Sequence, residues 1–278
     1  MGVVHMSIIQ ASFLSNCLKR KVHFNALLPI DPMFPEMFHA PLKTAYLLHG
    51  YTGSCDDWFV KHALGRLSQQ NNLAIILPNG ENHFYVDDMQ REDMYGEFVG
   101  RELVEFTRKV FPLSTAREDT IIGGISMGGY GSLRNGMKYN DVFGHIVAIS
   151  PAIIQNELTG PEFRPSIQGT TTGYYESVFG ELNTVTERDV DIFWLSQKMK
   201  NEGAIFPSIY FACGANDKLV FENRRFHAHL TQLGIPHVYE DEPGTHDAFF
   251  FDPHLAAGFA RLDLDRIPEM QNPLWVDS

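Results

Sequence analysis

The sequence predicts an α/β fold in which helices cover both faces of a mostly parallel sheet. Two observations carry this prediction. Short, continuously apolar runs, typical of strands buried on both faces, alternate with segments whose apolar residues recur at helical spacing. One such run, Thr120–Ile122, leads into a glycine-flanked serine and then into another helical segment. Because such sheets bind ligands beyond the carboxyl ends of their strands, we expect the functional residues in the loops at that edge.

Composition limits the class of protein and of partner. The 278 residues are 44% hydrophobic, which suits a single large domain over residues 1–278. The formal charge of −12 argues against a nucleic-acid or anionic-membrane partner. The cysteines Cys17, Cys55 and Cys213 show neither disulfide nor metal spacing, so we expect no metal, no cofactor and a reducing compartment. Without a signal-peptide pattern or a long apolar span, the sequence predicts a cytoplasmic protein.

The first half of the chain predicts an edge hairpin followed by strands and helices in alternation. Capping by Asp56 and Asp57 marks the start of the first helix, and Phe111-Pro112 marks the end of the second. The elements are, in order, an antiparallel hairpin from Ser7–Ser15 and Cys17–Pro29 with a tight turn near Asn16, a buried strand over Thr44–Gly50, a helix over Trp58–Gln70, a strand over Leu73–Leu77, and an amphipathic helix over Tyr95–Val110.

The second half continues this alternation, with one interruption. The interval 151–206 is rich in proline, threonine and glycine and predicts loops with a single short helix over Asp189–Lys200. Its aromatic residues indicate an ordered, lid-like insertion or a contact between subunits, so a homo-oligomer stays open. The remaining elements are the strand Thr120–Ile122, a helix over Tyr130–Tyr139, the strands His145–Ser150 and Ser208–Gly214, a helix over Glu222–Leu233, and the strand His237–Glu242.

The glycine-flanked serine has the G-x-S-x-G pattern of a nucleophile elbow. It reads Gly124-Ile125-Ser126-Met127-Gly128. In an elbow the serine occupies a strained strand-to-helix turn that lifts its hydroxyl clear of the sheet, and the flanking residues must be tiny because the turn is tight. An ordinary surface turn is the alternative, but the buried strand before Ser126 and the helix after it favour the elbow.

A serine hydroxyl needs a base, and the base needs a carboxylate. A neutral histidine takes the proton, and an acidic residue fixes its tautomer and stabilises the imidazolium. Asp217 follows the predicted strand Ser208–Gly214, and His246 follows the last strand, which gives the order serine, acid, histidine. Two alternatives remain open: Asp217 as a mere helix cap, and Asp247 as a rival acid, although the neighbour of His246 would struggle to reach its Nδ1.

The same reasoning predicts two oxyanion donors. The helix that follows Ser126 points free N–H groups at the site, so the Met127 N–H is one candidate. The second should come from the glycine-containing loop His49–Gly53, where the Tyr51 N–H is the best candidate and Gly50 gives flexibility. His49 then orients this loop and is not itself the base. An ordinary glycine turn is the alternative for this loop.

At these residues the chain resembles the esterase D-like group of α/β-hydrolases, which includes tributyrin esterases, S-formylglutathione hydrolases, and feruloyl or acetyl-xylan esterases. The resemblance covers Ala45 to the C-terminus, although Phe249–Pro253 departs from the family's pattern. It implies an α/β-hydrolase fold, a triad of Ser126, Asp217 and His246, and oxyanion donors at Tyr51 and Met127. The matching motifs are Leu47-Leu48-His49-Gly50-Tyr51-Thr52-Gly53, Asp57-Trp58, Gly124-Ile125-Ser126-Met127-Gly128-Gly129-Tyr130-Gly131, Gly214-Ala215-Asn216-Asp217 and Gly244-Thr245-His246-Asp247.

Together these observations predict a serine carboxylesterase that hydrolyses short-chain acyl esters through an acyl-serine intermediate. Its expected partner is a small-molecule ester. An acyltransferase that uses the same triad with an alcohol acceptor, and an S-formylglutathione thioesterase, are the alternatives. A catalytically inactive binding module is disfavoured because every catalytic part is present. Long-chain lipids are not expected as substrates, because the insertion mixes its aromatic residues with many charges.

Overall fold

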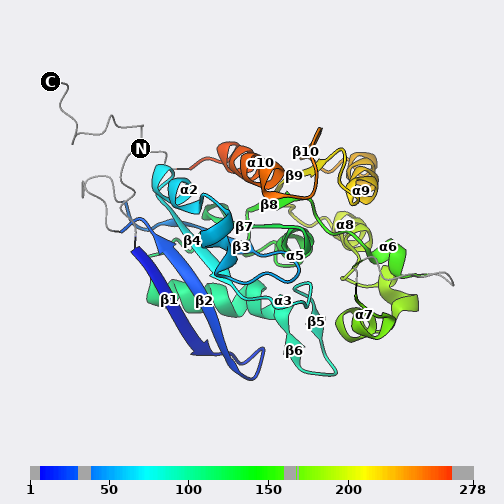
Figure 1. Cartoon of the computed structure of the whole chain (residues 1–278), viewed down its shortest axis with the longest axis horizontal. Helices are drawn as coiled ribbons and strands as arrows, with labels where there is room; N and C mark the ends of the chain where they lie inside the picture. The colour runs from blue at the N-terminus through cyan, green and yellow to red at the C-terminus, as the bar shows by residue number, and fades with distance from the viewer. Residues whose placement is uncertain (1–6, 31–38, 160–166, 168, 265–278) are drawn as a thin grey trace.

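A computed structural model describes residues 7–30, 39–159, 167 and 169–264 of the chain. Its centre is an eight-stranded sheet of order β1-β2-β4-β3-β7-β8-β9-β10 (Figure 1). The strands are β1 (Ser7–Leu14), β2 (Lys21–Leu28), β3 (Lys43–Leu48), β4 (Leu73–Pro78), β7 (Thr120–Ile125), β8 (His145–Ile149), β9 (Ser208–Gly214) and β10 (His237–Glu242).

Strand pairing confirms a mostly parallel sheet with an antiparallel hairpin at one edge. Strand β1 pairs antiparallel with β2, with Ser7 opposite Leu28, and β2 pairs antiparallel with β4. All other pairs of this sheet, from β4 across to β10, are parallel. The hairpin connection is longer than the predicted tight turn near Asn16. It runs over residues 15–20 because Glu102 accepts hydrogen bonds from the Ser15 hydroxyl and the Asn16 N–H.

Helices pack on both faces of the sheet, as predicted. Successive side chains of β3 point to opposite faces of the sheet. Tyr46 and Leu48 belong to the core on the face that α4, α5, α8 and α9 cover. Ala45 and Leu47 belong to the core on the face that α1, α2 and α10 cover (Figure 1). The helices are α1 (Asp57–Lys61), α2 (Leu64–Gln70), α3 (Tyr95–Glu97), α4 (Leu103–Val110), α5 (Met127–Lys138), α6 (Gln155–Leu158), α7 (Thr172–Phe179), α8 (Ile192–Asn201), α9 (Val220–Gln232) and α10 (Ala248–Ala260).

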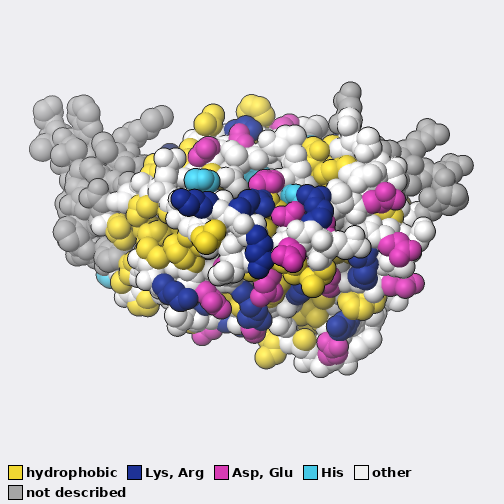
Figure 2. Space-filling view, turned by 90° about the horizontal axis from the view of Figure 1, so that it is seen from below, with side chains coloured by type: hydrophobic (Ala, Val, Ile, Leu, Met, Phe, Trp, Pro, Cys, Tyr) yellow, Lys and Arg dark blue, Asp and Glu magenta, His cyan; other side chains and the backbone are white. Residues whose placement is uncertain are grey.

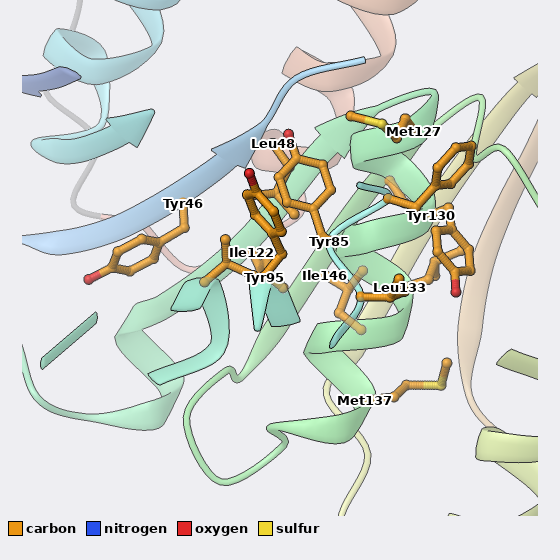
Figure 3. Close-up of a cluster of buried hydrophobic side chains, with 14 of the residues drawn as sticks. Tyr46, Leu48, Tyr85, Tyr95, Ile122, Met127, Tyr130, Leu133, Met137 and Ile146 are labelled. Carbon is orange, nitrogen blue, oxygen red and sulfur yellow. The ribbon is translucent and has the colours of Figure 1, made fainter. Parts of the chain in front are cut away.

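Helix α5 follows the candidate nucleophile, and it packs into the core that contains Tyr46 and Leu48. Its side chains Tyr130, Leu133 and Met137 are at most 1% exposed and belong to the same buried cluster as Ile122 and Ile146 of the sheet (Figure 3). Burial of each such side chain contributes about 1.5–3 kcal/mol. The start of this helix is therefore held rigidly against the sheet.

The helix predicted over Trp58–Gln70 is broken in the structure. Helix α1 ends at Lys61 and α2 begins at Leu64, with His62 in an extended conformation at φ −134° and ψ 147°. The extended backbone turns the His62 ring toward α10, where its Nδ1 contacts the Asp252 carboxylate. Asp56 makes no side-chain capping bond, so the predicted cap was also wrong.

The amphipathic helix predicted over Tyr95–Val110 is confirmed as one continuous helical run. It consists of α3, a π-helical turn over Phe98–Glu102, and α4. Gly100 allows this turn to approach the Tyr139 ring, since an added Cβ would lie 2.2 Å from that ring. A small ribbon of β5 (Asp87–Asp88) and β6 (Asp93–Met94), which precedes the run, was not predicted.

The insertion over residues 151–206 holds more helix than the single short one predicted. Besides α8, its described part forms α6, α7 and a 3₁₀ turn over Leu182–Glu187. The Thr171 hydroxyl caps α7 by accepting from the Tyr174 N–H at 3.2 Å, a local signal that the prediction of loops overlooked. Arg134 of α5, whose side chain is 1% exposed, holds the insertion through Asp189 at 2.8 Å.

The surface carries charges of both signs close together. Figure 2 shows basic and acidic side chains interspersed on one face, with hydrophobic side chains gathered toward one end of it. Ion pairs such as Arg20–Glu81 at 2.8 Å and Arg91–Asp93 at 3.3 Å belong to this mixed pattern. Within the described ranges, no helix has the length and apolar character needed to cross a membrane.

Candidate active site

Ser126 lies on a strained turn between β7 and α5. Its backbone has φ 54° and ψ −117°, a region that non-glycine residues rarely adopt. A Cβ on Gly124 would lie 2.6 Å from the carbonyl carbon of Gly128, and a Cβ on Gly128 would lie 1.9 Å from the oxygen of Leu48. Both positions therefore require glycine. The Ser126 N–H donates to the Ile149 oxygen at 2.9 Å, which ties the turn to β8.

The structure brings Ser126, His246 and Asp217 into one hydrogen-bonded chain. The Ser126 hydroxyl lies 2.9 Å from His246 Nε2, and His246 Nδ1 lies 2.6 Å from Asp217 Oδ2. The three residues follow β7, β10 and β9, so they meet at the carboxyl edge of the sheet. With Nδ1 donating to the carboxylate, a neutral His246 presents an unprotonated Nε2 to the serine hydroxyl.

Asp217 is suited to remain ionised. Its side chain is completely buried, and burial alone would raise its pKa, but hydrogen bonds from His246 and the Leu219 N–H outweigh burial and place the pKa below its usual value. The Leu219 N–H donates to Oδ1 at 2.9 Å. The capping alternative was wrong, because Leu219 is the N-cap residue of α9 and this helix has no side-chain cap.

Asp247, the rival acid, is occupied elsewhere. Its Oδ1 accepts from the N–H groups of Phe249 at 2.9 Å and Phe250 at 3.3 Å, and its Oδ2 accepts from the Thr245 hydroxyl. Asp247 is therefore the N-cap of α10. The His246 ring instead contacts Phe251 edge-on, with ring centroids 5.1 Å apart.

Tyr51 and Met127, the residues of the two predicted oxyanion donors, line the same cavity as Ser126. A Cβ on Gly50 would lie 3.4 Å from the Ser126 Cβ, so the loop after β3 passes directly against the serine. Met127 begins α5, where the first N–H groups have no partner within the helix. The structure records no hydrogen bond from the Tyr51 or Met127 N–H to another described residue. Within the described part of the chain, these two N–H groups therefore have no recorded backbone acceptor, and their role as oxyanion donors stays a prediction.

His49 ties the loop after β3 to the loop after β4. Its Nδ1 lies 2.8 Å from the Gly50 oxygen, and its Nε2 accepts from the Gly80 N–H at 2.9 Å. These contacts fix the tautomer with the proton on Nδ1. Burial lowers the pKa of His49, which favours the neutral ring that the Gly80 bond requires.

The insertion also reaches the loop after β3. The Tyr174 hydroxyl donates to the Asn82 carbonyl oxygen at 2.5 Å, and the Asn82 side-chain oxygen accepts from the Thr52 N–H at 2.8 Å. The Tyr174 and Tyr51 rings meet edge to face, with centroids 5.8 Å apart. Sequence reasoning counted Tyr174 only as part of the aromatic insertion, because no local pattern links it to Tyr51.

A cavity of about 520 Å³ opens above Ser126, in the size range of small-molecule sites. We call it the substrate cavity. Apolar and charged side chains both line it, and several come from the insertion. Besides the residues already described, its lining includes Asp57, Trp58, Lys61, His62, Phe84, Ile125, Ala152, Ile154, Glu157, Ile167, Lys218, Leu219 and Phe251. The described residues contain no cluster of three or more histidine, cysteine or acidic side chains that could hold a metal ion.

Comparison with protein families and solved structures gives concordant matches. The model of the family described as "Putative esterase" matches residues 15–262. An acetyl esterase of Caldicellulosiruptor saccharolyticus is 44% identical over 260 residues, which cover 91% of this chain and 97% of that protein.

Two solved structures from Staphylococcus aureus share the fold across nearly their whole length. The fluorophosphonate-binding serine hydrolase F, solved with bound substrate, matches with a TM-score of 0.81 and 25% identity over 92% of this chain and 98% of that one. An S-formylglutathione hydrolase matches with a TM-score of 0.79 and 27% identity over the same shares, 92% and 98%.

Proposed function

This chain belongs to the esterase family matched above and is a serine carboxylic ester hydrolase, and we propose that it removes short acyl groups, acetyl to butyryl, from small esters. The observation that carries the proposal is the chain of hydrogen bonds from Ser126 through His246 to Asp217. The acetyl esterase similarity supports the short acyl group. The ligand is a small-molecule ester and not a nucleic acid.

In the first half-reaction Ser126 is the nucleophile. Its oxygen attacks the ester carbonyl carbon while His246 Nε2 takes the hydroxyl proton. Asp217 stabilises the imidazolium that forms. The negative oxygen of the tetrahedral intermediate accepts from the Tyr51 and Met127 N–H groups, each such donor contributing about 3–4 kcal/mol to catalysis. The bond to the alcohol oxygen then breaks, and His246 returns the proton to the departing alkoxide, which leaves an acyl-serine.

In the second half-reaction water takes the place of the alcohol. His246 removes a proton from water as its oxygen attacks the acyl carbon, and the same two N–H groups hold the second oxyanion. Collapse of this intermediate breaks the bond to Ser126, and the serine recovers its proton from His246. The products are a carboxylic acid and the free enzyme.

A thioesterase remains the second candidate, and one observation favours it. The S-formylglutathione hydrolase structure is similar over 92% of this chain. A thioester carbonyl would meet the same nucleophile and oxyanion donors, so the proposed catalytic residues do not discriminate between esters and thioesters. Acyl transfer to an alcohol would also use this machinery, with the alcohol in place of water.

The proposal is tested with a panel of p-nitrophenyl esters from acetate to dodecanoate, matching thioesters, and a small alcohol as competing acceptor. We expect kcat/KM to peak between acetate and butyrate and hydrolysis to exceed transfer. Ser126→Ala should lower kcat by roughly 10⁴- to 10⁶-fold while the fold is retained. A peak at octanoate or beyond would overturn the short-chain preference, and preferential turnover of thioesters would overturn the assignment to esters. Fluorophosphonate labelling of another serine would overturn Ser126 as the nucleophile.

The domain organisation and cellular setting are further parts of this proposal. We regard residues 1–278 as one α/β-hydrolase domain whose insertion at 151–206 acts as a lid, because Ile154, Glu157 and Ile167 line the substrate cavity. Free thiols at all three cysteines support a cytoplasmic location. A homo-oligomer formed through the insertion stays a prediction, and sedimentation velocity would test it.

A further inference from the structure

Trp58 and His62 close one end of the substrate cavity. Both residues line this cavity of about 520 Å³, and both also line a second cavity of about 190 Å³. Their rings lie side by side, with centroids 4.7 Å apart and planes inclined by 47°. We call this pair the Trp58–His62 wall. It is a thin partition, because the same two side chains face both cavities.

The second cavity offers apolar contacts. Apart from the wall, it is lined by Ile8 and Leu27 of the hairpin and by Phe59, Leu64 and Gly65 of the α1–α2 region. Among the described residues, the His62 imidazole is the only acidic or basic side chain in its lining. Ile8 is 58% exposed, so this cavity is open to solvent on the side of the hairpin. Its apolar lining suits a hydrocarbon chain and offers few partners to a charged or hydroxylated group.

The wall is held mainly through His62. The His62 side chain is only 4% exposed, and its Nδ1 contacts the Asp252 carboxylate of α10. Trp58 is 1% exposed, and its indole N–H has no hydrogen-bond partner within the described part of the chain. Packing alone, including the contact with His62, therefore holds the indole in place. The break between α1 and α2 is what directs His62 toward Asp252.

We propose that the Trp58–His62 wall sets the upper length of an unbranched hydrocarbon chain on the substrate, and that the second cavity is the continuation such a chain would enter if the wall were removed. This inference rests on the proposed ester hydrolysis. The chain belongs either to the acyl group or to the alcohol, since both have the same chemistry. His62 and Trp58 are thus specificity-determining residues that take no part in bond breaking.

The test compares chain-length profiles of the parent and of His62→Ala. One series varies the acyl group in p-nitrophenyl esters from C2 to C12, and the other varies the alcohol in alkyl acetates from C2 to C10. Each newly buried methylene favours the longer substrate about three- to fourfold. We therefore expect the C8:C2 ratio of kcat/KM to rise at least tenfold in one series. The series that responds identifies the group that lies against the wall.

Matched variants distinguish an opening in the Trp58–His62 wall from a general loss of packing around the second cavity. Ile8→Ala enlarges the second cavity without touching the wall, so its C8:C2 ratio should stay within twofold of the parent. Adding Ile8→Trp to His62→Ala refills the second cavity and should restore the short-chain preference. Asp252→Asn keeps the ring but weakens its anchor, and we expect a smaller rise of about threefold. Trp58→Ala should act in the same direction as His62→Ala.

The outcomes distinguish this inference from the proposed function. If folded His62→Ala, Trp58→Ala and Asp252→Asn all keep both C8:C2 ratios within twofold of the parent, the wall does not limit chain length. An equal rise in Ile8→Ala would also refute it, because the wall is intact there. A parent enzyme that hydrolyses no acetate ester at all would instead overturn the proposed function. Circular dichroism and Tm verify the fold, and Asp252→Asn decides the matter if the core variants do not fold.

Discussion

Among the described residues, three histidines line the substrate cavity, and two of them pair their Nδ1 with an aspartate. His246 contacts Asp217, and His62 contacts Asp252. The two histidines differ in what the rest of the ring contacts. His246 Nε2 is 2.9 Å from the Ser126 hydroxyl, whereas the His62 ring lies against Trp58. A histidine–aspartate contact therefore occurs both at His246, the proposed catalytic base, and at His62, which we propose only shapes the cavity. The contact between His246 Nε2 and the serine hydroxyl distinguishes the two histidines.

The two aspartates also differ in their surroundings. The Asp217 side chain is 0% exposed, while that of Asp252 is 36% exposed. Water competes for an exposed carboxylate and screens its charge, so Asp252 orients its partner less firmly. Asp217 receives a further backbone N–H from Leu219, which leaves its carboxylate little freedom to rotate.

Replacing each histidine should give the largest difference. His246→Ala removes the proposed base, whose Nε2 lies 2.9 Å from the Ser126 hydroxyl, and we expect kcat to fall roughly 10⁴- to 10⁶-fold on p-nitrophenyl acetate. His62→Ala should cost tenfold at most on the same substrate. Steady-state kinetics on both purified variants decide this, and a comparable loss in the two would end the distinction between the pairs.

Replacing each aspartate should repeat the contrast on a smaller scale. Asp217→Asn cannot hold the correct tautomer of His246 or stabilise its charge, so we expect kcat/KM to fall about 10³- to 10⁴-fold. Asp252→Asn should lower it less than tenfold on acetate. A result for Asp217→Asn within a few-fold of the parent would assign the acid role to another carboxylate.

A third histidine, His49, pairs with backbone groups instead of a carboxylate. His49→Ala frees the loop that carries Tyr51, and we expect a loss of about 10- to 100-fold in kcat. Because burial lowers its pKa, His49 contributes stability that is present above about pH 6.5 and is lost as the pH falls below that value. Chemical denaturation between pH 5 and 8 should show this slope in the parent and a weaker one in the variant.

Tyr174 supports the same loop from the insertion through its bond to Asn82. Tyr174→Phe removes that hydrogen bond but keeps the ring against Tyr51, so we expect kcat to fall two- to fivefold with KM nearly unchanged. Tyr239→Phe is the matched control, since the buried Tyr239 hydroxyl has no hydrogen-bond partner among the described residues. Equal effects of the two substitutions would show that the Asn82 contact does not matter.

Asp191 shows what burial does to an aspartate without a histidine. Burial raises the pKa of Asp191 from 3.8 to about 6, whereas the pKa of Asp217 is lowered. The folded state therefore holds the Asp191 proton more tightly, and ionisation costs stability as the pH rises from about 4 to about 6. Asp191→Asn keeps a cap for α8 and should stabilise the protein above pH 6 by up to about 3 kcal/mol, with little effect on turnover. Unfolding curves at pH 4 and 8 test this, and equal differences at both would refute it.

Sequence reasoning was most reliable where the signal is local or repeated along a strand. Gly124, Ser126 and Gly128 lie within one turn, so their spacing encodes the geometry directly, and the parallel strands followed from continuous apolar runs. The elbow also placed Met127, since the next residue after the serine begins the helix. The order of strands along the chain then predicted that Asp217 and His246 lie at the same edge of the sheet as Ser126.

The features that sequence reasoning missed depend on residues far apart in the chain. His62 and Asp252 are 190 residues apart, and no spacing rule connects them. The break after α1, which directs His62 toward Asp252, interrupts the helical pattern of Trp58–Gln70. The helices of the insertion are short, and distant residues such as Arg134 and Lys138, which both contact Asp189, hold this segment in place. No local spacing pattern records such contacts.

The distance along the chain between Ser126 and its base has a consequence for biosynthesis. His246 lies 120 residues after Ser126, on the segment that follows the last strand of the sheet. A ribosome releases the elbow well before it has made β10, so the emerging polypeptide carries a serine that has no base. Under the proposed mechanism, ester cleavage therefore begins only after β10 has docked beside β9, and the appearance of activity during translation or refolding reports the completion of the sheet.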